Sequence, residues 1–387
     1  MSSIAAPTLS PLDHSSPPAG DKIRVLVVDD SVIFRKIVRD ALSALPNVEV
    51  VGSAANGRIA IEKIEQYSPD LITLDFEMPE LDGPGVLRWL RASRRPTKAV
   101  MLSALTVEGG EATLEALQEG AFDFVVKPSG ADAQANLLEL QTALQHRVDA
   151  VHTLLAGKRS QRPAARTISA PVPPPISSRS PTTPKRPQPG LHRIGIVGIG
   201  VSTGGPDALR IMLPQLPADL PVPVVVVQHM PPVFTRSLAD SLNKLCQLRV
   251  SEGADGQIIR PGEIVIAPGG RQMKVHKLSM GQARVELTDD PPVQSCRPSV
   301  DYLFASLAEA YGGQVLSVIM TGMGYDGADG CRRLHALGGP VIAQDEASCV
   351  VFGMPRKPVE EGIADVVAPL GSLAAEVVRY AGRRAHA

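Results

Sequence analysis

The sequence has few cysteines and none of the spacings that hold a structural metal. Its four cysteines, at positions 246, 296, 331 and 349, form no C-x-x-C pair and no zinc-site pattern. In a chain of 387 residues this indicates reduced, packed thiols and argues against a disulfide framework. A catalytic cysteine is the alternative to burial as a small apolar side chain, which is the interpretation we favour.

Long apolar runs and an excess of one charge are also absent. Residues 1–21 contain neither the basic segment nor the apolar stretch of a secretory signal. No run approaches the roughly 20 residues that cross a bilayer. We therefore expect a cytoplasmic protein without membrane insertion. The 39 basic and 40 acidic residues leave a net charge of −1, which argues against nucleic acid as a partner.

The length exceeds the roughly 250 to 300 residues of a single hydrophobic core, so we expect two domains. Between them, residues 157–193 hold nine prolines, eight lysines or arginines and no acid. Such a segment buries too little apolar surface to offset its ordering entropy. The predicted organisation is a disordered tail (1–21), a first domain (22–155), a disordered linker (156–192) and a second domain (193–384).

Strand and helix patterns alternate on both sides of this linker. The first domain has five short apolar runs, separated by stretches long enough for helices: IRVLVVDD, VEVVGSA, LITLD, KAVMLSA and FDFVVKP. Five buried strands with crossover helices predict a parallel, doubly wound sheet. The second domain has similar runs and a hairpin-like region over 264–289. It is predicted to be α/β as well, with a mostly parallel sheet.

Polar residues follow four strands of the first domain. Asp29 and Asp30 end the first strand, Asp75 ends the third, and Ser103 and Lys127 close the fourth and fifth. These positions share one edge of an open α/β sheet, where ligands bind. Three carboxylates this close repel one another unless a hard cation such as Mg²⁺ neutralises them. One carboxylate could then attack a phosphoryl donor while Lys127 and Ser103 stabilise the charge on its oxygens.

The same residues carry a resemblance. The segments RVLVVDDSVIFRKIV, LDFEMPELDG and FDFVVKP are similar to the response-regulator receiver domain, over residues 22 to about 150. The resemblance implies Asp75 as phosphoacceptor and a histidine kinase as phosphoryl donor. It also implies a Mg²⁺ site formed by Asp75, Asp29, Asp30 and the backbone carbonyl of Glu77.

Residues 194–206, IGIVGIGVSTGGP, allow two interpretations. The glycines fit a loose G-x-G-x-x-x-G pattern, but a dinucleotide site needs an acid after the next strand to bind the ribose. That strand ends in Gln228 and His229, which argues against a nicotinamide-dependent oxidoreductase. In the other interpretation, a strand-to-helix turn presents Ser202 as a nucleophile.

A serine nucleophile needs a base and a group that orients the base. His229, at the end of the next strand, is the candidate base, and Asp326, in the glycine-rich loop of IMTGMGYDG, is the candidate orienter. Ser, His and Asp from three strand ends fit the logic of a serine hydrolase. Asp301 and Asp345 are rival orienters that the sequence does not exclude. His276, in the hairpin-like region, and His335, in a predicted helix, are weaker candidates for the base.

A second resemblance covers residues 194–382. GVSTGGP, VVVVQHMPPVFTRSLAD, SCRPSVDYLF, IMTGMGYDGADG and AQDEASCVVFGMP are similar to the catalytic domain of the chemotaxis protein-glutamate methylesterases, the CheB family. The resemblance implies the same catalytic roles for the three residues named above. It also implies that the Met323 backbone N–H helps to form the oxyanion hole and that Thr203 lines the site. Val201 stands where the family often has alanine.

This resemblance implies a phosphorylation-activated serine hydrolase that demethylates glutamate γ-methyl esters on the cytoplasmic helices of chemoreceptors. Deamidation of receptor glutamines is implied as a second activity, and no cofactor is implied for the ester hydrolysis. We expect a monomer in which the first domain packs across the cleft of the second. The competing interpretation is a binding module that docks to a partner without chemistry.

Overall fold

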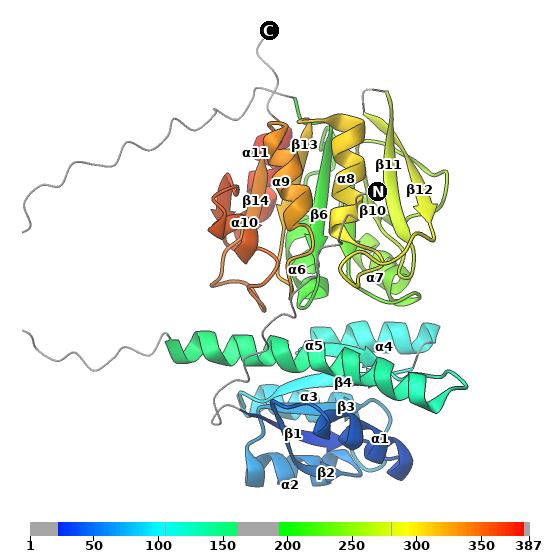
Figure 1. Ribbon diagram of the computed structural model, residues 1–387, viewed down its shortest axis with the longest axis vertical. Coiled ribbons are helices and arrows are strands. Elements are labelled where there is room, and N and C mark those ends of the chain that lie inside the picture. Colours follow the sequence, from blue (N-terminus) through cyan, green and yellow to red (C-terminus); the bar gives the residue numbers. More distant parts are fainter. Residues whose placement is uncertain (1–21, 105, 161–192, 280, 383–387) are drawn as a thin grey trace, which may run out of the picture.

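The structure, a computed structural model, describes residues 22–104, 106–160, 193–279 and 281–382 (Figure 1). The predicted N-terminal tail and residues 161–192 of the predicted linker lie outside this part of the chain. No helix of the described residues is both long enough and apolar enough to cross a bilayer.

The first domain is the predicted five-stranded parallel sheet, with strand order β2-β1-β3-β4-β5. Its central strand β3 is buried along its whole length, as expected of a strand covered on both faces. The strands are β1 (Ile23–Val28), β2 (Val48–Ala54), β3 (Leu71–Asp75), β4 (Lys98–Ser103) and β5 (Asp123–Val126). The helices are α1 (Val32–Ser43), α2 (Gly57–Tyr67), α3 (Gly83–Ala92), α4 (Val107–Gln118) and α5 (Ala133–Ser160).

Helix α5 runs to Ser160, past the predicted domain boundary at residue 155. The prediction placed the boundary where the composition changes. A helix, however, continues until a residue breaks it, and the first proline of the segment is Pro163. The first residues assigned to the linker are therefore helical.

The second domain has a seven-stranded sheet with order β15-β14-β13-β6-β7-β10-β8, and all its strand pairs are parallel. Three strands of this domain, β8, β9 and β15, had no counterpart in the sequence prediction, because their sequences RVSE, II and VVA contain no apolar run longer than three residues. The sheet strands are β6 (Ile196–Val201), β7 (Val224–Gln228), β8 (Arg249–Glu252), β10 (Glu263–Ile266), β13 (Val315–Ile319), β14 (Val341–Gln344) and β15 (Val366–Ala368).

The predicted hairpin-like region divides between two sheets. Its first strand, β10, belongs to the main parallel sheet, because EIVI is an apolar run buried between neighbours. The remainder forms the antiparallel pair β11 (Gln272–Ser279) and β12 (Gln282–Thr288), which β9 (Ile258–Ile259) extends. The helices of this domain are α6 (Gly205–Met212), α7 (Phe234–Asn243), α8 (Val300–Tyr311), α9 (Ala328–Ala336), α10 (Arg356–Glu360) and α11 (Leu373–Ala381).

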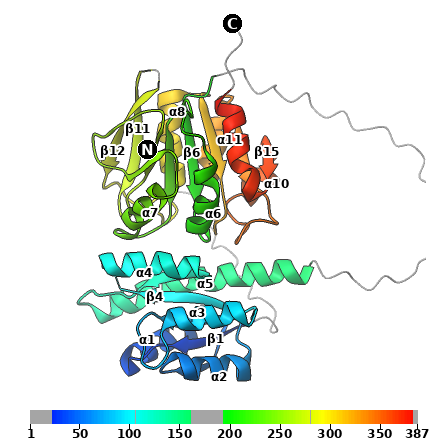
Figure 2. The ribbon, with the colours of Figure 1, turned by 180° about the vertical axis from the view of Figure 1, so that it is seen from behind.

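The two domains pack against each other through α4, α5 and β5 of the first. Figures 1 and 2 show α4 and α5 lying between the first sheet and the second domain. The rings of Phe124, on β5, and Phe234, on α7, stack with their centroids 4.6 Å apart. Gly110 of α4 lies against Ser237 of α7: a Cβ added at Gly110 would stand 2.9 Å from the Ser237 hydroxyl. The first domain therefore covers the side of the second that carries α6 and α7.

Candidate active site

Ser202 and His229 leave two neighbouring strands at the same level. In the parallel pair β6–β7, Val201 lies opposite Gln228, so the residues that follow them emerge side by side at the carboxyl edge. Strand β13 flanks β6 on its other side and leads into the loop that carries Asp326. The three predicted residues therefore come from three adjacent strand ends, as the sequence analysis proposed.

The turn after Ser202 depends on glycine. Gly204 has φ +75°, and a Cβ there would stand 2.5 Å from the side chain of Val350. The earlier glycines of the pattern have a different reason: a Cβ at Gly198 or Gly200 would stand 2.8 Å or less from side chains of α8. They let a helix pack closely on β6, which accounts for the pattern without a nucleotide.

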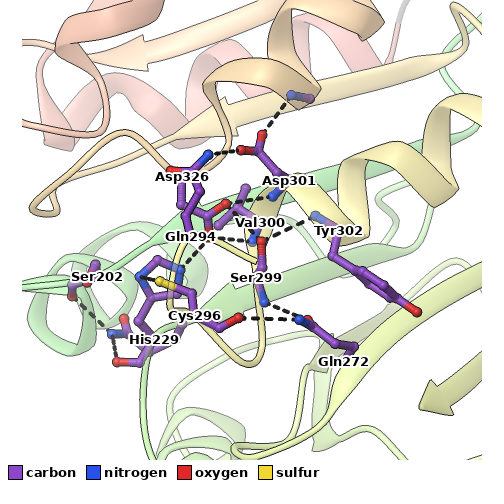
Figure 3. A network of polar contacts seen from close by, with 12 residues as sticks. Ser202, His229, Gln272, Gln294, Cys296, Ser299, Val300, Asp301, Tyr302 and Asp326 are labelled. Atoms are coloured by element: carbon purple, nitrogen blue, oxygen red, sulfur yellow. Dashed lines mark hydrogen bonds and ion pairs between the residues drawn. The ribbon is translucent and has the colours of Figure 1, made fainter. Parts of the chain in front are cut away.

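Asp326 orients His229. His229 Nε2 lies 2.8 Å from Asp326 Oδ2, and the carboxylate is 4% exposed. The N-terminus of α8 supplies further donors to it: Ser299 Oγ and the backbone N–H groups of Val300 and Asp301, at 2.7 to 2.9 Å (Figure 3). Burial alone would raise the pKa of Asp326, but the bonds from His229 and from these N–H groups hold it below the ordinary value. Asp326 is therefore a fixed anion.

The other ring nitrogen of His229 lies near a thiol. Cys296 Sγ is 3.7 Å from Nδ1. Burial would lower the pKa of His229, but the bonds to Asp326 and Cys296 outweigh it and raise the pKa to about 10. Among the described residues no hydrogen bond joins Ser202 Oγ to the ring.

Backbone donors are available beside Ser202. The backbone N–H of Met323 donates to no acceptor among the described residues, which suits the predicted oxyanion role. Thr203 lies in the same turn, but its hydroxyl donates to Asp123 Oδ2 of the first domain at 3.1 Å. The side chain of Met323 packs on a cluster that joins β1, α1 and α5 of the first domain with Val351 of the second. In this arrangement Thr203, predicted to line the site, is bonded to the first domain.

The acidic edge of the first domain has the predicted composition. Asp29, Asp30 and Asp75 bring one carboxylate oxygen each within 4.8 Å of one another. Lys127 Nζ lies 3.0 Å from Asp29 Oδ2 and 2.7 Å from Asp75 Oδ2. Burial and the neighbouring Asp75 raise the pKa of Asp29, in spite of Lys127. A carboxylate set whose charges oppose each other fits a hard divalent cation, so these residues suit Mg²⁺.

Ser103 and Glu77 complete this edge. Ser103 Oγ accepts a hydrogen bond from Thr113 Oγ1 at 2.8 Å and donates to Gly109 O at 3.3 Å, both on α4. It is therefore tied to the helix that packs on the second domain. Glu77 follows Asp75 closely on the loop after β3, and its side chain is exposed.

Comparison with known proteins gives a family for each of the two domains. The CheB methylesterase family matches residues 197–377, and the response regulator receiver domain matches residues 25–139. The protein-glutamate methylesterase/protein-glutamine glutaminase of Desulfotalea psychrophila is 47% identical over 360 residues, 92% of this chain and 98% of that protein. The protein of the same name from Symbiobacterium thermophilum is 45% identical over 362 residues, 93% of this chain and 97% of that protein.

The chain belongs to the CheB methylesterase family. Among solved structures, the catalytic domain of the Thermotoga maritima CheB methylesterase is 42% identical. It covers 48% of this chain and 98% of its own length, with a TM-score of 0.46.

Within this CheB-family chain, the rival candidates have other roles. Asp301 Oδ1 accepts from Gly330 N at 2.7 Å, and Asp301 does not contact His229. Asp345 accepts hydrogen bonds from the N–H and hydroxyl of Ser348. His276 pairs with Glu286 on the β11–β12 hairpin, and His335 lies in the last turn of α9. None of these four residues contacts Ser202 or His229 in the described part of the chain.

Two site residues escaped the sequence analysis. Gln228, 2% exposed, donates through Nε2 to the carbonyls of Ser202 and His229 and so ties the two turns together. Cys296 was considered only as a packed thiol or a nucleophile. A glutamine at a strand end and a cysteine in a long loop give no periodic signal, so only the fold brings them to the site.

Proposed function

We propose that this chain hydrolyses glutamate γ-methyl esters on the cytoplasmic helices of chemoreceptors, with Ser202 as nucleophile, His229 as base and Asp326 as orienter. The observation that carries the proposal is the 2.8 Å contact between His229 Nε2 and a buried, fully bonded Asp326, next to Ser202 on the adjacent strand end. The names of the relatives, protein-glutamate methylesterase/protein-glutamine glutaminase, support this substrate.

The proposed reaction uses both nitrogens of His229. Asp326 holds Nε2–H, which leaves Nδ1, near Cys296 in the structure, as the nitrogen that would serve Ser202. Once the ring is neutral and faces Ser202, Nδ1 takes the hydroxyl proton as Oγ attacks the ester carbonyl. The free N–H of Met323 stabilises the oxyanion. His229 then protonates the departing methanol, and water hydrolyses the acyl-enzyme to give the glutamate carboxylate.

Glutamine deamidation would follow the same route. Attack on a γ-amide forms the same acyl-enzyme, with ammonia in place of methanol. Ammonia is the poorer leaving group, so we expect deamidation to be slower. Water completes both reactions, and we expect neither to require a cofactor.

We propose that a histidine kinase phosphorylates Asp75 and that this opens the second domain. Asp29, Asp30, Asp75 and the Glu77 carbonyl would hold Mg²⁺, which neutralises phosphoryl charge when bound. Ser103 and Lys127 would contact the phosphoryl oxygens. Moving Ser103 Oγ toward them breaks its bonds to Thr113 and Gly109 on α4. Since α4 packs on α7, the contact between the domains weakens.

The esterase proposal is tested by methanol release from methylated receptor fragments. Replacing Ser202 by alanine is expected to lower turnover by about 10⁴-fold or more. Ser279→Ala, an exposed serine on β11, is the matched control and should keep the rate of the unchanged chain. If the Ser202→Ala variant released methanol at nearly the rate of the unchanged chain, the proposed nucleophile would be wrong.

The regulatory proposal has a separate test. A fragment that begins near residue 191 lacks the first domain and should be active without a phosphodonor. The full chain should need acetyl phosphate and Mg²⁺ for comparable activity. A fragment that stays inactive unless the first domain is added back would overturn control by simple occlusion. We further propose that the protein is a cytoplasmic monomer with the two domains bounded as predicted, apart from the helical extension of α5.

A further inference from the structure

The proposed reaction leaves one reactive group beside the base unused. Cys296 Sγ lies 3.7 Å from His229 Nδ1, the nitrogen that has to serve Ser202. Both side chains are partly exposed, so solutes can reach them. A thiol and an imidazole nitrogen are the ligands that zinc prefers.

The spacing of these two atoms suits a shared metal. Zinc lies about 2.3 Å from a thiolate sulfur and about 2.0 to 2.1 Å from an imidazole nitrogen, and a tetrahedral angle then separates the ligands by about 3.5 Å. The observed separation of 3.7 Å between Sγ and Nδ1 differs from this by a few tenths of an ångström, within reach of a small side-chain rotation. A metal could therefore bind both atoms without a change in the backbone.

The surroundings of His229 resemble those of a metal-bound histidine. Such a ring usually donates its other N–H to a carboxylate, which fixes the tautomer and the ring orientation. Here His229 Nε2 bonds to Asp326, and α8 in turn holds that carboxylate. Asp326 therefore supports the ring through Nε2, and the other ring nitrogen, Nδ1, faces Cys296.

The loop that carries Cys296 is also fixed. The backbone N–H of Cys296 donates to the carbonyl of Val293 at 2.8 Å, and the carbonyl of Cys296 accepts from the N–H of Val293 at 3.1 Å. Its carbonyl also accepts from Gln272 Nε2 at 3.3 Å. The sulfur is thus held in place near the ring before any ligand arrives, and little ordering entropy opposes binding.

We propose that His229 Nδ1 and Cys296 Sγ form a binding site for a thiophilic divalent cation such as Zn²⁺, and that its binding inhibits hydrolysis. The metal replaces the proton held between the two atoms: one Zn–N and one Zn–S bond form, and the proton leaves to solvent. Water fills the remaining positions. The inhibitory part rests on the proposed function, because the metal acts by keeping Nδ1 from Ser202.

The two domains would then respond to different cations. The acidic edge of the first domain offers only oxygen ligands, which suit Mg²⁺. The cluster of His229 and Cys296 offers nitrogen and sulfur, which suit zinc. The other described thiols, Cys246, Cys331 and Cys349, belong to no such cluster, so a thiol-bound metal should depend on Cys296 alone.

Direct binding is tested first, with Co²⁺ as a spectroscopic probe in place of zinc. Added to the full chain, it should give a thiolate charge-transfer band and the visible bands of tetrahedral cobalt. We expect both in the unchanged chain and in Cys246→Ser, and neither in Cys296→Ser. Equal thiolate bands in all three proteins, or none in the unchanged chain, would overturn the site. This readout does not depend on enzyme activity.

Inhibition is tested by methanol release at constant Mg²⁺ and acetyl phosphate, with each rate compared with that of the same variant free of zinc. Zn²⁺ should inhibit the unchanged chain and Cys246→Ser, and a chelator should restore the rate. Cys296→Ser should need at least about tenfold more zinc for the same inhibition, a difference of about 1.4 kcal/mol. Equal sensitivity of all three would refute the inhibitory role. A cobalt signal without methanol release from any protein would instead refute the proposed function and leave the site standing.

Discussion

Asp29 and Asp326 are both buried carboxylates at the carboxyl edge of a parallel sheet, but their surroundings have opposite effects. Asp29 faces Asp75, and this neighbour and burial raise its pKa. Asp326 faces His229 and the N-terminus of α8, and the bonds it accepts lower its pKa. The repulsion at the first edge therefore suits a cation, whereas at the second the bonds that Asp326 accepts already stabilise its charge.

The comparison shows that the sheet topology determines where a site lies and that the surrounding residues determine its chemistry. In the first domain the strand ends bring together carboxylates, one lysine and the Ser103 hydroxyl, so the edge suits transfer of a charged phosphoryl group. In the second, the N-terminus of α8 donates hydrogen bonds to Asp326 and keeps it ionised beside His229. The predictions below test this difference, the first three in order of decreasing effect.

The largest effect is expected from Asp326→Asn. An amide cannot accept all the hydrogen bonds that this carboxylate accepts, and it leaves His229 in the wrong tautomer. We expect methanol release to fall by about 10³-fold or more. Asp345→Asn, at the rival carboxylate that accepts from Ser348, is the matched control and should lose little activity. An Asp326→Asn variant with near-normal turnover would show that this edge does not work through an oriented base.

The contact between the two domains, where α4 packs on α7, is tested by Gly110→Leu. Gly110 has an ordinary helical conformation, so leucine should not harm α4, but its side chain has no room against Ser237. We expect about a tenfold rise in activity without phosphodonor, because loss of about 1.4 kcal/mol of docking energy suffices for that. Glu115→Leu, at an exposed position of the same helix, should leave the basal rate unchanged. If both variants behaved alike, α4 would not control the site.

At the acidic edge of the first domain, removing a carboxylate should stabilise the fold, whereas removing Asp326 from the second domain should abolish a needed contact. Asp29→Asn relieves its repulsion with Asp75 and leaves Lys127 paired with Asp75. We expect the first domain to gain about 1 kcal/mol in free energy of unfolding, measured in urea without divalent cations. Mg²⁺-dependent phosphorylation by acetyl phosphate should be lost. Asp30→Asn, at an exposed carboxylate, should change the stability less; an Asp29→Asn variant that unfolds more easily would contradict the comparison.

The last prediction concerns Asp301, beside Asp326, and the stability of the second domain rather than its activity. Burial and the nearby Asp326 raise its pKa to about 7. The folded state then binds the proton more tightly than the unfolded state, so stability falls as pH rises from about 4 to 7. The Asp301→Asn variant has no carboxyl group to titrate there. The difference in unfolding free energy, variant minus unchanged chain, should therefore increase as the pH rises from about 4 to 7 and stay constant above that. Hydrogen exchange of the β6 and β13 amides measures the unfolding free energy of this domain, with Asp40→Asn on α1 as the control. A difference between Asp301→Asn and the unchanged chain that did not vary with pH would contradict the raised pKa of Asp301.

Much of this arrangement could be predicted from the sequence because the strands are short, apolar runs that end in polar residues. Asp29, Asp75 and Lys127 follow three such runs, and Ser202 and His229 follow two more, so the parallel topology alone brings each set to one edge. The boundaries were less certain: α5 continues beyond residue 155 because composition changes before the helix is broken.

The remainder of the site could not be predicted, because it depends on contacts between distant segments. Ser299 is an ordinary helix cap in the sequence, and only the fold turns α8 so that this cap bonds to Asp326. Cys296 lies 67 residues from His229 along the chain. Asp123 begins β5 in one domain, yet it accepts a hydrogen bond from Thr203 in the other. No local pattern encodes such pairs.

The most direct test of the central claim is covalent labelling of the full chain with a fluorophosphonate, located by peptide mass spectrometry. A hydroxyl activated by an oriented imidazole should be labelled at Ser202, faster with acetyl phosphate and Mg²⁺ than without, and hardly at all in the Asp326→Asn variant. If Ser202 stayed unlabelled in protein that Asp75 phosphorylation had opened, the second domain would be a docking module rather than a hydrolase.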